Sequence, residues 1–227
     1  RALPLKRYTD RTVTSLPDLP ARGVRLPRMA RRAQLLRAAR DVFVANCYHA
    51  AAMDEIAERA GVSKPVLYQH FPGKLDLYLA LLDDSGEELL RRLHAALRST
   101  DDNKERVTAT ITAYFAFVDD PAGSYRLLFE SDLTNEAAVR ERLDRLNAAC
   151  ADEIAKIIAE DTGLPVEEST LLAIGLVGIA QVTARYWLDA EGSIPRDAAA
   201  GLAATQGWRG IRGLRNREGV GPFTGGT

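Results

Sequence analysis

Residues 53–74 constrain the fold more than any other part of the chain, because they encode two short helices around a sharp turn. Ile56 and Ala60 recur at helical spacing and give the first helix, residues 53–60, an apolar face. Gly61 follows at the position where a helix often ends in a left-handed residue, a conformation that costs glycine little. We therefore expect a helix-turn-helix in this segment.

The second short helix, residues 64–70, has its own start and stop signals. Ser63 is a suitable N-cap, and Pro65 lies in the first turn, where its missing N–H breaks no helical hydrogen bond. Pro72 and Gly73 then end the helix, and a longer helix is expected to begin at the next residue.

The outward face of this second helix indicates a function. Val62 and Leu67 are expected to point to the core, which leaves Lys64, Val66 and Tyr68 facing outward. An ordinary corner between two helices would show the same turn. However, an exposed tyrosine and lysine on so short a helix favour DNA binding, because the second helix of a helix-turn-helix lies in the major groove.

Charge is distributed unevenly along the chain. The 227 residues carry a net charge of −1, yet residues 1–40 hold eleven Lys or Arg against two Asp, a balance of +9, which leaves −10 for the remainder. A basic front and an acidic body suit a protein that offers one end to a polyanion. Residues 1–27 lack helical periodicity and are predicted to be a flexible basic arm, which either reaches the DNA or stays in solvent.

The rest of the chain indicates an all-α protein, since alanine, leucine, arginine and glutamate dominate and strand-type alternation is almost absent. Residues 28–74 are expected to form a three-helix DNA-binding domain, residues 75–214 a larger helical domain, and residues 215–227 a disordered tail. Beyond the two short helices, the expected helices are 28–46, 74–98, 103–119, 121–131, 136–161, 167–190 and 195–214.

The helix over residues 167–190 is apolar on nearly all sides, so it should be buried on one side by its own domain and on the other by a partner. Gly175 and Gly178 would let another helix approach closely. A homodimer follows, because two copies of a helix-turn-helix on a two-fold axis read a palindromic site. The longest apolar run, Leu171 to Ala180, is too short to span a bilayer, so no membrane association is expected.

Other classes of site find little support. Cys47 and Cys150 suggest no disulfide framework, and residues 1–30 contain no apolar secretory segment, so a cytoplasmic protein is expected. The three histidines match no catalytic pattern or metal spacing, and no glycine-rich phosphate loop is present. Neither an enzyme nor a bound metal or cofactor is therefore expected.

Several motifs match a known family. Gly61–Lys64, Leu67-Tyr68, His70-Phe71 and Lys74 closely resemble the signature of the TetR family of bacterial transcription regulators, and the resemblance covers about residues 28–214. It implies a dimer joined by the last two long helices and a small-molecule pocket in the larger domain. The DNA-binding residues predicted from the motif and the basic segment are Ser63, Lys64, Pro65, Val66, Tyr68, His70, Lys74 and Arg28.

Two positions qualify this set. His70 could equally be a packed histidine that closes the turn. The family usually has Thr or Ser just before the first short helix, whereas this chain has alanines at residues 50–52. The phosphate contact usual at that point is therefore in doubt, and the basic arm could compensate for it.

The segments 61–71, 125–130 and 184–190 are more narrowly similar to actinobacterial regulators of fatty-acid synthase genes. This resemblance implies that a long-chain acyl-CoA is the effector. It leaves open whether the protein activates or represses transcription. For any single pocket candidate, ordinary core packing is favoured over a ligand contact. The predicted ligand-binding residues are Phe115, Val118, Leu127, Phe129, Leu146, Cys150, Ile174 and Val177. The alternative function is a soluble carrier of apolar ligands, such as lipids, whose helix-turn-helix is vestigial.

Overall fold

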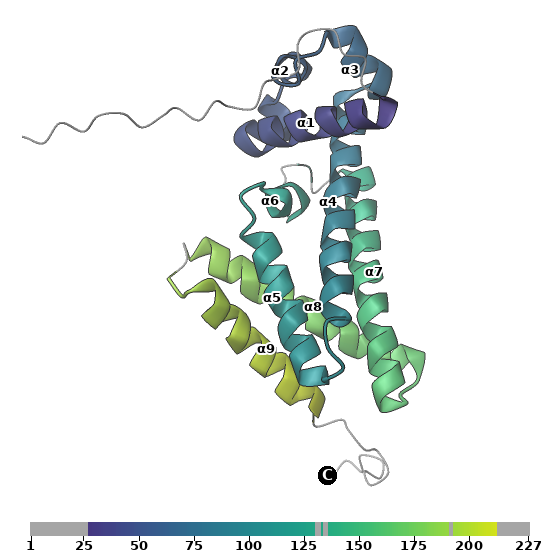
Figure 1. Ribbon diagram of the computed structural model, residues 1–227, viewed down its shortest axis with the longest axis vertical. Helices are drawn as coiled ribbons and strands as arrows, with labels where there is room; N and C mark the ends of the chain where they lie inside the picture. The colour runs from purple at the N-terminus through teal and green to yellow at the C-terminus, as the bar shows by residue number, and fades with distance from the viewer. Residues whose placement is uncertain (1–26, 130–132, 134–135, 191–192, 213–227) are drawn as a thin grey trace, which may run out of the picture.

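The computed structural model describes residues 27–129, 133, 136–190 and 193–212 (Figure 1). Throughout this part of the chain the regular elements are α-helices, which confirms the all-α prediction. The predicted basic arm lies outside the described residues except for Pro27, and so does the predicted tail. The helices are α1 (Arg28–Ala50), α2 (Met53–Arg59), α3 (Lys64–His70), α4 (Lys74–Leu97), α5 (Asn103–Val118), α6 (Ser124–Phe129), α7 (Ala137–Thr162), α8 (Val166–Asp189) and α9 (Arg196–Arg212).

Helices α1, α2 and α3 form a small group across the upper end of the long helix α4 (Figure 1). Leu35 of α1, Ile56 of α2 and Leu67 of α3 are completely buried and form the centre of this group. Gly61 has a φ of +64° in the turn between α2 and α3, the left-handed conformation that the sequence indicated. The predicted helix-turn-helix is therefore present.

The end of α1 is irregular in a way that the sequence did not predict. We expected the helix to end near residue 46, whereas it continues to Ala50 across a break at Cys47, whose φ is 57° and ψ 174°. The ammonium of Lys74 donates to the carbonyl oxygens of Tyr48, His49 and Ala51, at 2.9, 3.1 and 2.9 Å. These bonds join the distorted end of α1 to the start of α4.

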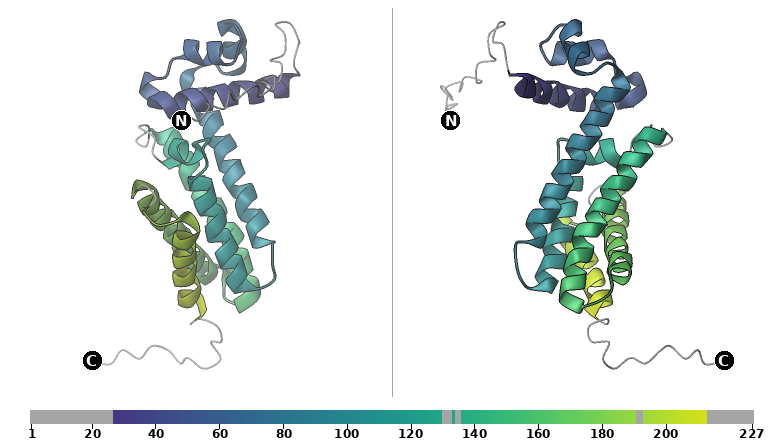
Figure 2. Two further views of the ribbon diagram at one scale, coloured as in Figure 1. Left: turned by 60° about the vertical axis from the view of Figure 1, so that its left-hand side comes forward. Right: turned by 90° about the vertical axis from the view of Figure 1, so that its right-hand side faces the viewer.

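Helix α4 runs from this group into a bundle with α5, α7, α8 and α9 (Figures 1 and 2). Its core includes Leu81, Phe115 and Phe117, each no more than 1% exposed. The two parts of the molecule share α4, so a displacement of this helix within the bundle must also reach α1 and the helix-turn-helix.

Helix α6 provides a second connection, because it lies between α1 and the bundle (Figure 1). The hydroxyl of Tyr78 on α4 donates to the carbonyl oxygen of Leu127 at 2.8 Å. Gly123, just before α6, has a φ of +69°, and a Cβ built there would lie 2.9 Å from both γ-carbons of Val44. The backbone before α6 therefore passes against α1 so closely that only glycine fits without a shift.

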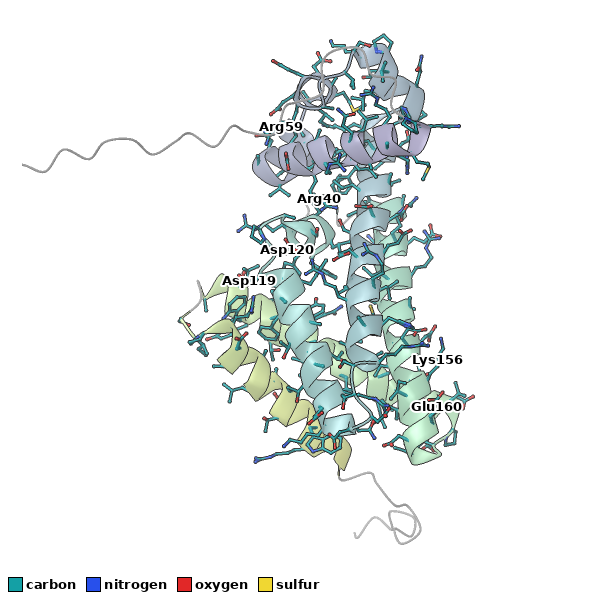
Figure 3. All side chains as sticks on the ribbon, in the orientation of Figure 1. Arg40, Arg59, Asp119, Asp120, Lys156 and Glu160 are labelled. Carbon is teal, nitrogen blue, oxygen red and sulfur yellow. The ribbon has the colours of Figure 1, made fainter. Side chains whose placement is uncertain are left out.

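Ion pairs also stabilise the junction, the region where α1 meets α4 and α6. Arg40 of α1 binds Asp84 of α4 at 2.7 Å, and Arg92 of α4 binds Asp120, before α6, at 2.6 Å. Figure 3 labels Arg40 below α1 and Asp120 near the upper end of α5. The Ala122 amide and then Arg92 lower the pKa of Asp120 despite its partial burial, which keeps this carboxylate charged.

Helix α8 is buried on one side only. Ala173, Ala180 and Ala184 face the bundle, where they are no more than 7% exposed. The opposite side is open, with the side chains of Leu171, Ile174, Val182 and Tyr186 between 55% and 71% exposed. Helix α8 as a whole is long and apolar enough to cross a membrane by length and composition alone, a test that the core helix of a soluble protein also passes.

Candidate DNA interface and ligand cavity

Helix α3 is anchored on one side and open on the other. Leu67 is completely buried, whereas the side chain of Tyr68 is 46% exposed. Lys64 and Pro65 are exposed and Val66 is half-buried. The residues that the sequence predicted to face outward therefore lie on the accessible side of α3, where a DNA groove could receive them.

The side chains of Lys64 and Ser63 differ in their interactions within the protein. The ammonium of Lys64 binds the carboxylate of Asp54 on α2 at 2.6 Å, with both side chains about 60% exposed. Such an exposed ion pair stabilises the fold little, so Lys64 could leave Asp54 for an acceptor on DNA with little loss of free energy. Ser63 is the N-cap residue of α3, as the sequence predicted, but its side chain makes no capping hydrogen bond.

His70 lies at the end of α3 near the basic start of α1. Burial, followed by the charges of Arg28, Arg32 and Arg31, lowers the pKa of His70 below its ordinary value. Its imidazole is therefore neutral at neutral pH. The same three arginines make this edge positive, and Arg32 also lies over the ring of Phe71 at 4.7 Å.

Lys74 is already engaged. Besides its three carbonyl acceptors, its ammonium lies 4.5 Å from the centre of the Tyr48 ring. A phosphate contact by Lys74 would therefore compete with bonds that hold the end of α1. The sequence could not reveal this role, because it depends on the irregular backbone after Asn46.

The bundle contains a cavity of about 90 Å³ between α4, α5, α7, α8 and α9. Its wall is almost entirely apolar, and it includes Leu93, Val107, Ile111, Ile154, Ile158 and Leu176. The cavity is smaller than the roughly 300–1,000 Å³ of typical small-molecule sites, so a large ligand would have to separate the surrounding helices.

Only part of the predicted ligand set reaches this cavity. Cys150 and Val177 line it. Ile174 is 55% exposed on the outer side of α8, which makes it unsuitable as a cavity residue. The other five are packed elsewhere in the core rather than on the cavity wall: Phe115, Val118, Leu127, Phe129 and Leu146.

Polar residues on the cavity wall were missed. Arg92 comes from α4, and Arg106, Thr110 and Tyr114 follow one another at four-residue steps along α5. This spacing places the three α5 residues on one helical face, a signal that was present in the sequence. In the described residues, no group of three His, Cys, Asp or Glu could hold a metal ion.

A basic helix-turn-helix joined by one long helix to a bundle with an internal apolar cavity defines a DNA-binding transcription regulator with a separate helical domain. The family models agree: "Bacterial regulatory proteins, tetR family" matches residues 35–81, and "Tetracyclin repressor-like, C-terminal domain" matches residues 103–210. The chain belongs to the TetR family of transcription regulators, and it is a regulator rather than an enzyme.

Two curated relatives illustrate the range of similarity. The chain is 46% identical to the HTH-type transcriptional activator FasR of Mycolicibacterium smegmatis, over 84% of this chain and 87% of FasR. It is 28% identical to the nucleoid occlusion factor SlmA of Vibrio vulnificus, over 52% of this chain and 64% of SlmA.

Solved structures share the fold. A TetR-like regulator from Rhodococcus sp. RHA1 is 30% identical with a TM-score of 0.66, over 83% of this chain and all of the other. FadR from Bacillus subtilis, solved in complex with stearoyl-CoA, has a TM-score of 0.65 over 77% of this chain and 96% of FadR. At 19% identity, the match to FadR shows the fold alone.

Proposed function

We propose that this chain controls lipid-metabolism genes in the cytoplasm as a homodimer whose DNA binding responds to a long-chain acyl-CoA. The observation that carries the proposal is the apolar cavity within the same molecule as an accessible helix-turn-helix. The similarity to the transcriptional activator FasR favours activation. The choice of genes rests on the resemblance of segments 61–71, 125–130 and 184–190 to regulators of fatty-acid synthase genes. The stearoyl-CoA bound by FadR shows that this fold can hold such a ligand.

In this proposal α3 enters the major groove. Lys64 would exchange Asp54 for a guanine acceptor, and Val66 would contact a thymine methyl group, with Pro65 beside them. Tyr68 would donate to a phosphate, as would Ser63, whose hydroxyl α3 does not use.

A second group of phosphate contacts would come from the basic edge formed by α1 and α3. Arg28 would supply charge, and His70 would donate one hydrogen bond to the same backbone. We assign Lys74 chiefly to holding the end of α1, because three carbonyl oxygens already surround its ammonium. The DNA-binding surface would therefore run from the start of α1 along α3.

The homodimer would form through the exposed side of α8. Leu171, Ile174, Val182 and Tyr186 are separated by steps of three, eight and four residues, which place them on one side of the helix as an apolar stripe. No atom of the described residues lies within 4 Å of a Cβ placed at Gly175 or Gly178, so a partner helix has room to approach this stripe. A two-fold dimer would then present two copies of α3, about 34–36 Å apart, to a palindromic site.

Ligand binding would be coupled to DNA binding through the junction. A long acyl chain exceeds the present cavity, so it would have to displace α4 or α5. Arg92 lines the cavity and also binds Asp120, ahead of α6, which in turn contacts α1. The ligand could change DNA affinity only by as much as it prefers one arrangement of the helices over the other.

The proposal is tested by measuring DNA binding to a fatty-acid synthase promoter fragment, with and without a long-chain acyl-CoA, across salt concentrations. We expect tight binding that weakens steeply with salt and changes when acyl-CoA is added. DNA binding that acyl-CoA leaves unchanged would contradict the proposed effector. Acyl-CoA binding without specific DNA binding would instead favour the alternative, a soluble carrier with a vestigial helix-turn-helix.

A further inference from the structure

Two hydroxyl groups on the cavity wall have no hydrogen-bond partner in the described part of the protein. They are Thr110 Oγ1 and Tyr114 Oη, which are both buried and lie one helical turn apart on α5. The whole side chain of Tyr114 is only 9% exposed. Buried polar groups normally have partners, so this pair requires an explanation.

The environment of Thr110 makes its lack of a partner informative. Threonine in a helix usually donates to the carbonyl oxygen four residues earlier. In this chain Thr108, Thr162 and Thr183 do so, at 2.9, 2.6 and 2.6 Å. Thr110 does not, although Thr108 lies in the same helix. Its hydroxyl is therefore available to a molecule inside the cavity.

The groups around Tyr114 favour a neutral ligand atom. Burial raises the pKa of Tyr114 far above its ordinary range, and it raises the pKa of the nearby Cys150 thiol to about 11. Both groups are therefore protonated and can donate at neutral pH. Of the two arginines in the described lining, Arg92 is held by Asp120 and Glu88, each at 2.6 Å. Among the described residues Arg106 has only the fully exposed Asp101 as its ion-pair partner, but it lies eight residues before Tyr114, about two helical turns away. A ligand carboxylate at Tyr114 would therefore be a buried charge without a free counter-ion.

We infer that Thr110 and Tyr114 form a polar subsite that receives a neutral carbonyl oxygen of an otherwise apolar ligand. The subsite rests on the proposed function and narrows its ligand class. The carbonyl oxygen of a thioester, ester or amide can accept both hydrogen bonds without bringing a charge into the cavity. A free carboxylate would bring a charge into the cavity. The sensor thereby distinguishes an activated acyl group from a free fatty acid.

The test compares hexadecanoyl-CoA with its thioether analogue S-hexadecyl-CoA, which has the same chain and nucleotide but no carbonyl group. Isothermal titration calorimetry on the full chain should show the thioester binding about tenfold more tightly, the contribution of one or two neutral hydrogen bonds. Hexadecanoic acid should bind more weakly than the thioester.

Variants locate the effect. Tyr114→Phe should weaken thioester binding about three- to tenfold and leave thioether binding unchanged. Thr110→Val should act in the same direction, whereas Thr108→Val, which changes the same residue type on the same helix outside the cavity wall, should leave both affinities as they are.

The outcomes separate the subsite from the proposed function. Equal affinities for thioester and thioether, with no selective loss in Tyr114→Phe, would mean that a water or nothing occupies these hydroxyls, and would overturn the subsite alone. Tighter binding of the free acid would overturn the neutral character of the ligand group. If neither CoA compound binds or alters DNA affinity, both the subsite and the proposed effector are wrong.

Discussion

At the scale of single residues, two buried tyrosine hydroxyls differ in role: one stabilises the fold through a hydrogen bond, and the other is available to a ligand. The hydroxyl of Tyr78 donates to Leu127, whereas the hydroxyl of Tyr114 has no hydrogen-bond partner among the described residues. We expect Tyr78→Phe to lower the free energy of unfolding by about 1 kcal/mol, because it removes a buried hydrogen bond. Tyr114→Phe should be neutral, or should stabilise the ligand-free protein by about 1 kcal/mol.

Urea unfolding of both variants in the absence of ligand checks this comparison, since both tyrosines are buried and both substitutions remove one oxygen. Equal destabilisation of the two variants would mean that Tyr114 has a structural partner in solution, and would count against its role as a ligand group.

His70 gives the molecule a pH dependence whose sign can be stated. Its pKa is lowered in the folded chain, so the unfolded chain binds more protons below the ordinary value of 6.5. The contribution of His70 to the free energy of unfolding is therefore fully present above about pH 6.5, and it is lost as the pH falls toward the folded-state pKa. Unfolding measured from pH 7.5 to 5 should show this loss, and His70→Asn should reduce it.

DNA binding should have the opposite dependence if His70 contacts a phosphate. A nearby phosphate favours the imidazolium, so DNA affinity should rise as the pH falls through the same range. Affinity that is as flat with pH in the wild type as in His70→Asn would identify His70 as a packed residue that only closes the turn.

At the scale of helices, the sequence predicted most of the fold because hydrophobic periodicity, prolines and glycines are local signals. The first helix of the helix-turn-helix, for example, was expected over residues 53–60 and occupies Met53–Arg59. The break at Cys47 was not predictable, since no glycine or proline marks it. Lys74, which satisfies the carbonyl oxygens after that break, was accordingly expected to contact only DNA.

The cavity was harder to predict for a different reason. Periodicity identifies the apolar face of a helix, but the packing of several helices decides which apolar residues meet a cavity. Ile174 and Val177 are three residues apart on α8, yet the first faces outward and the second lines the cavity. The unpartnered hydroxyl of Tyr114 could be found only once the surrounding helices were in place.

The close approach of α1 and the start of α6 provides a prediction at this scale. Gly123→Ala should lower the free energy of unfolding by about 3 kcal/mol, because the new methyl group is strained at positive φ and also meets Val44. Gly163 has the same φ of +69°, but a Cβ built there has no atom of the described part of the chain within 4 Å. Gly163→Ala should therefore lower the free energy of unfolding only by the cost of the backbone strain at positive φ, about 1–2 kcal/mol.

Thermal or urea unfolding of the two alanine variants isolates the contact from the backbone strain. The difference between them should also appear in DNA binding, because Gly123 lies where the bundle meets α1. Equal losses of stability for both variants would show that α1 and the segment before α6 can move apart, which would remove this junction as a route for ligand coupling.

At the scale of the whole molecule, the open side of α8 has to be reconciled with a protein that binds DNA. A single copy leaves Leu171, Val182 and Tyr186 about 70% exposed, in one stripe beside two glycines. Apolar stripes of this kind mark interaction surfaces. A second copy related by a two-fold axis would cover the stripe and would place two copies of α3 on the same side of the assembly.

Helix α8 also offers a matched pair of variants for testing this dimer. Val182 and Val166 are 69% and 70% exposed, but their separation of 16 positions places their side chains roughly 160° apart around the helix. Val182→Glu should yield a monomer in sedimentation velocity and should weaken binding to a palindromic site by at least about tenfold, since one half-site contact is lost. Val166→Glu should leave both properties unchanged. A Val182→Glu protein that stays dimeric would exclude this stripe as the interface, and association of the wild type with lipid vesicles instead of with itself would assign the stripe to a membrane.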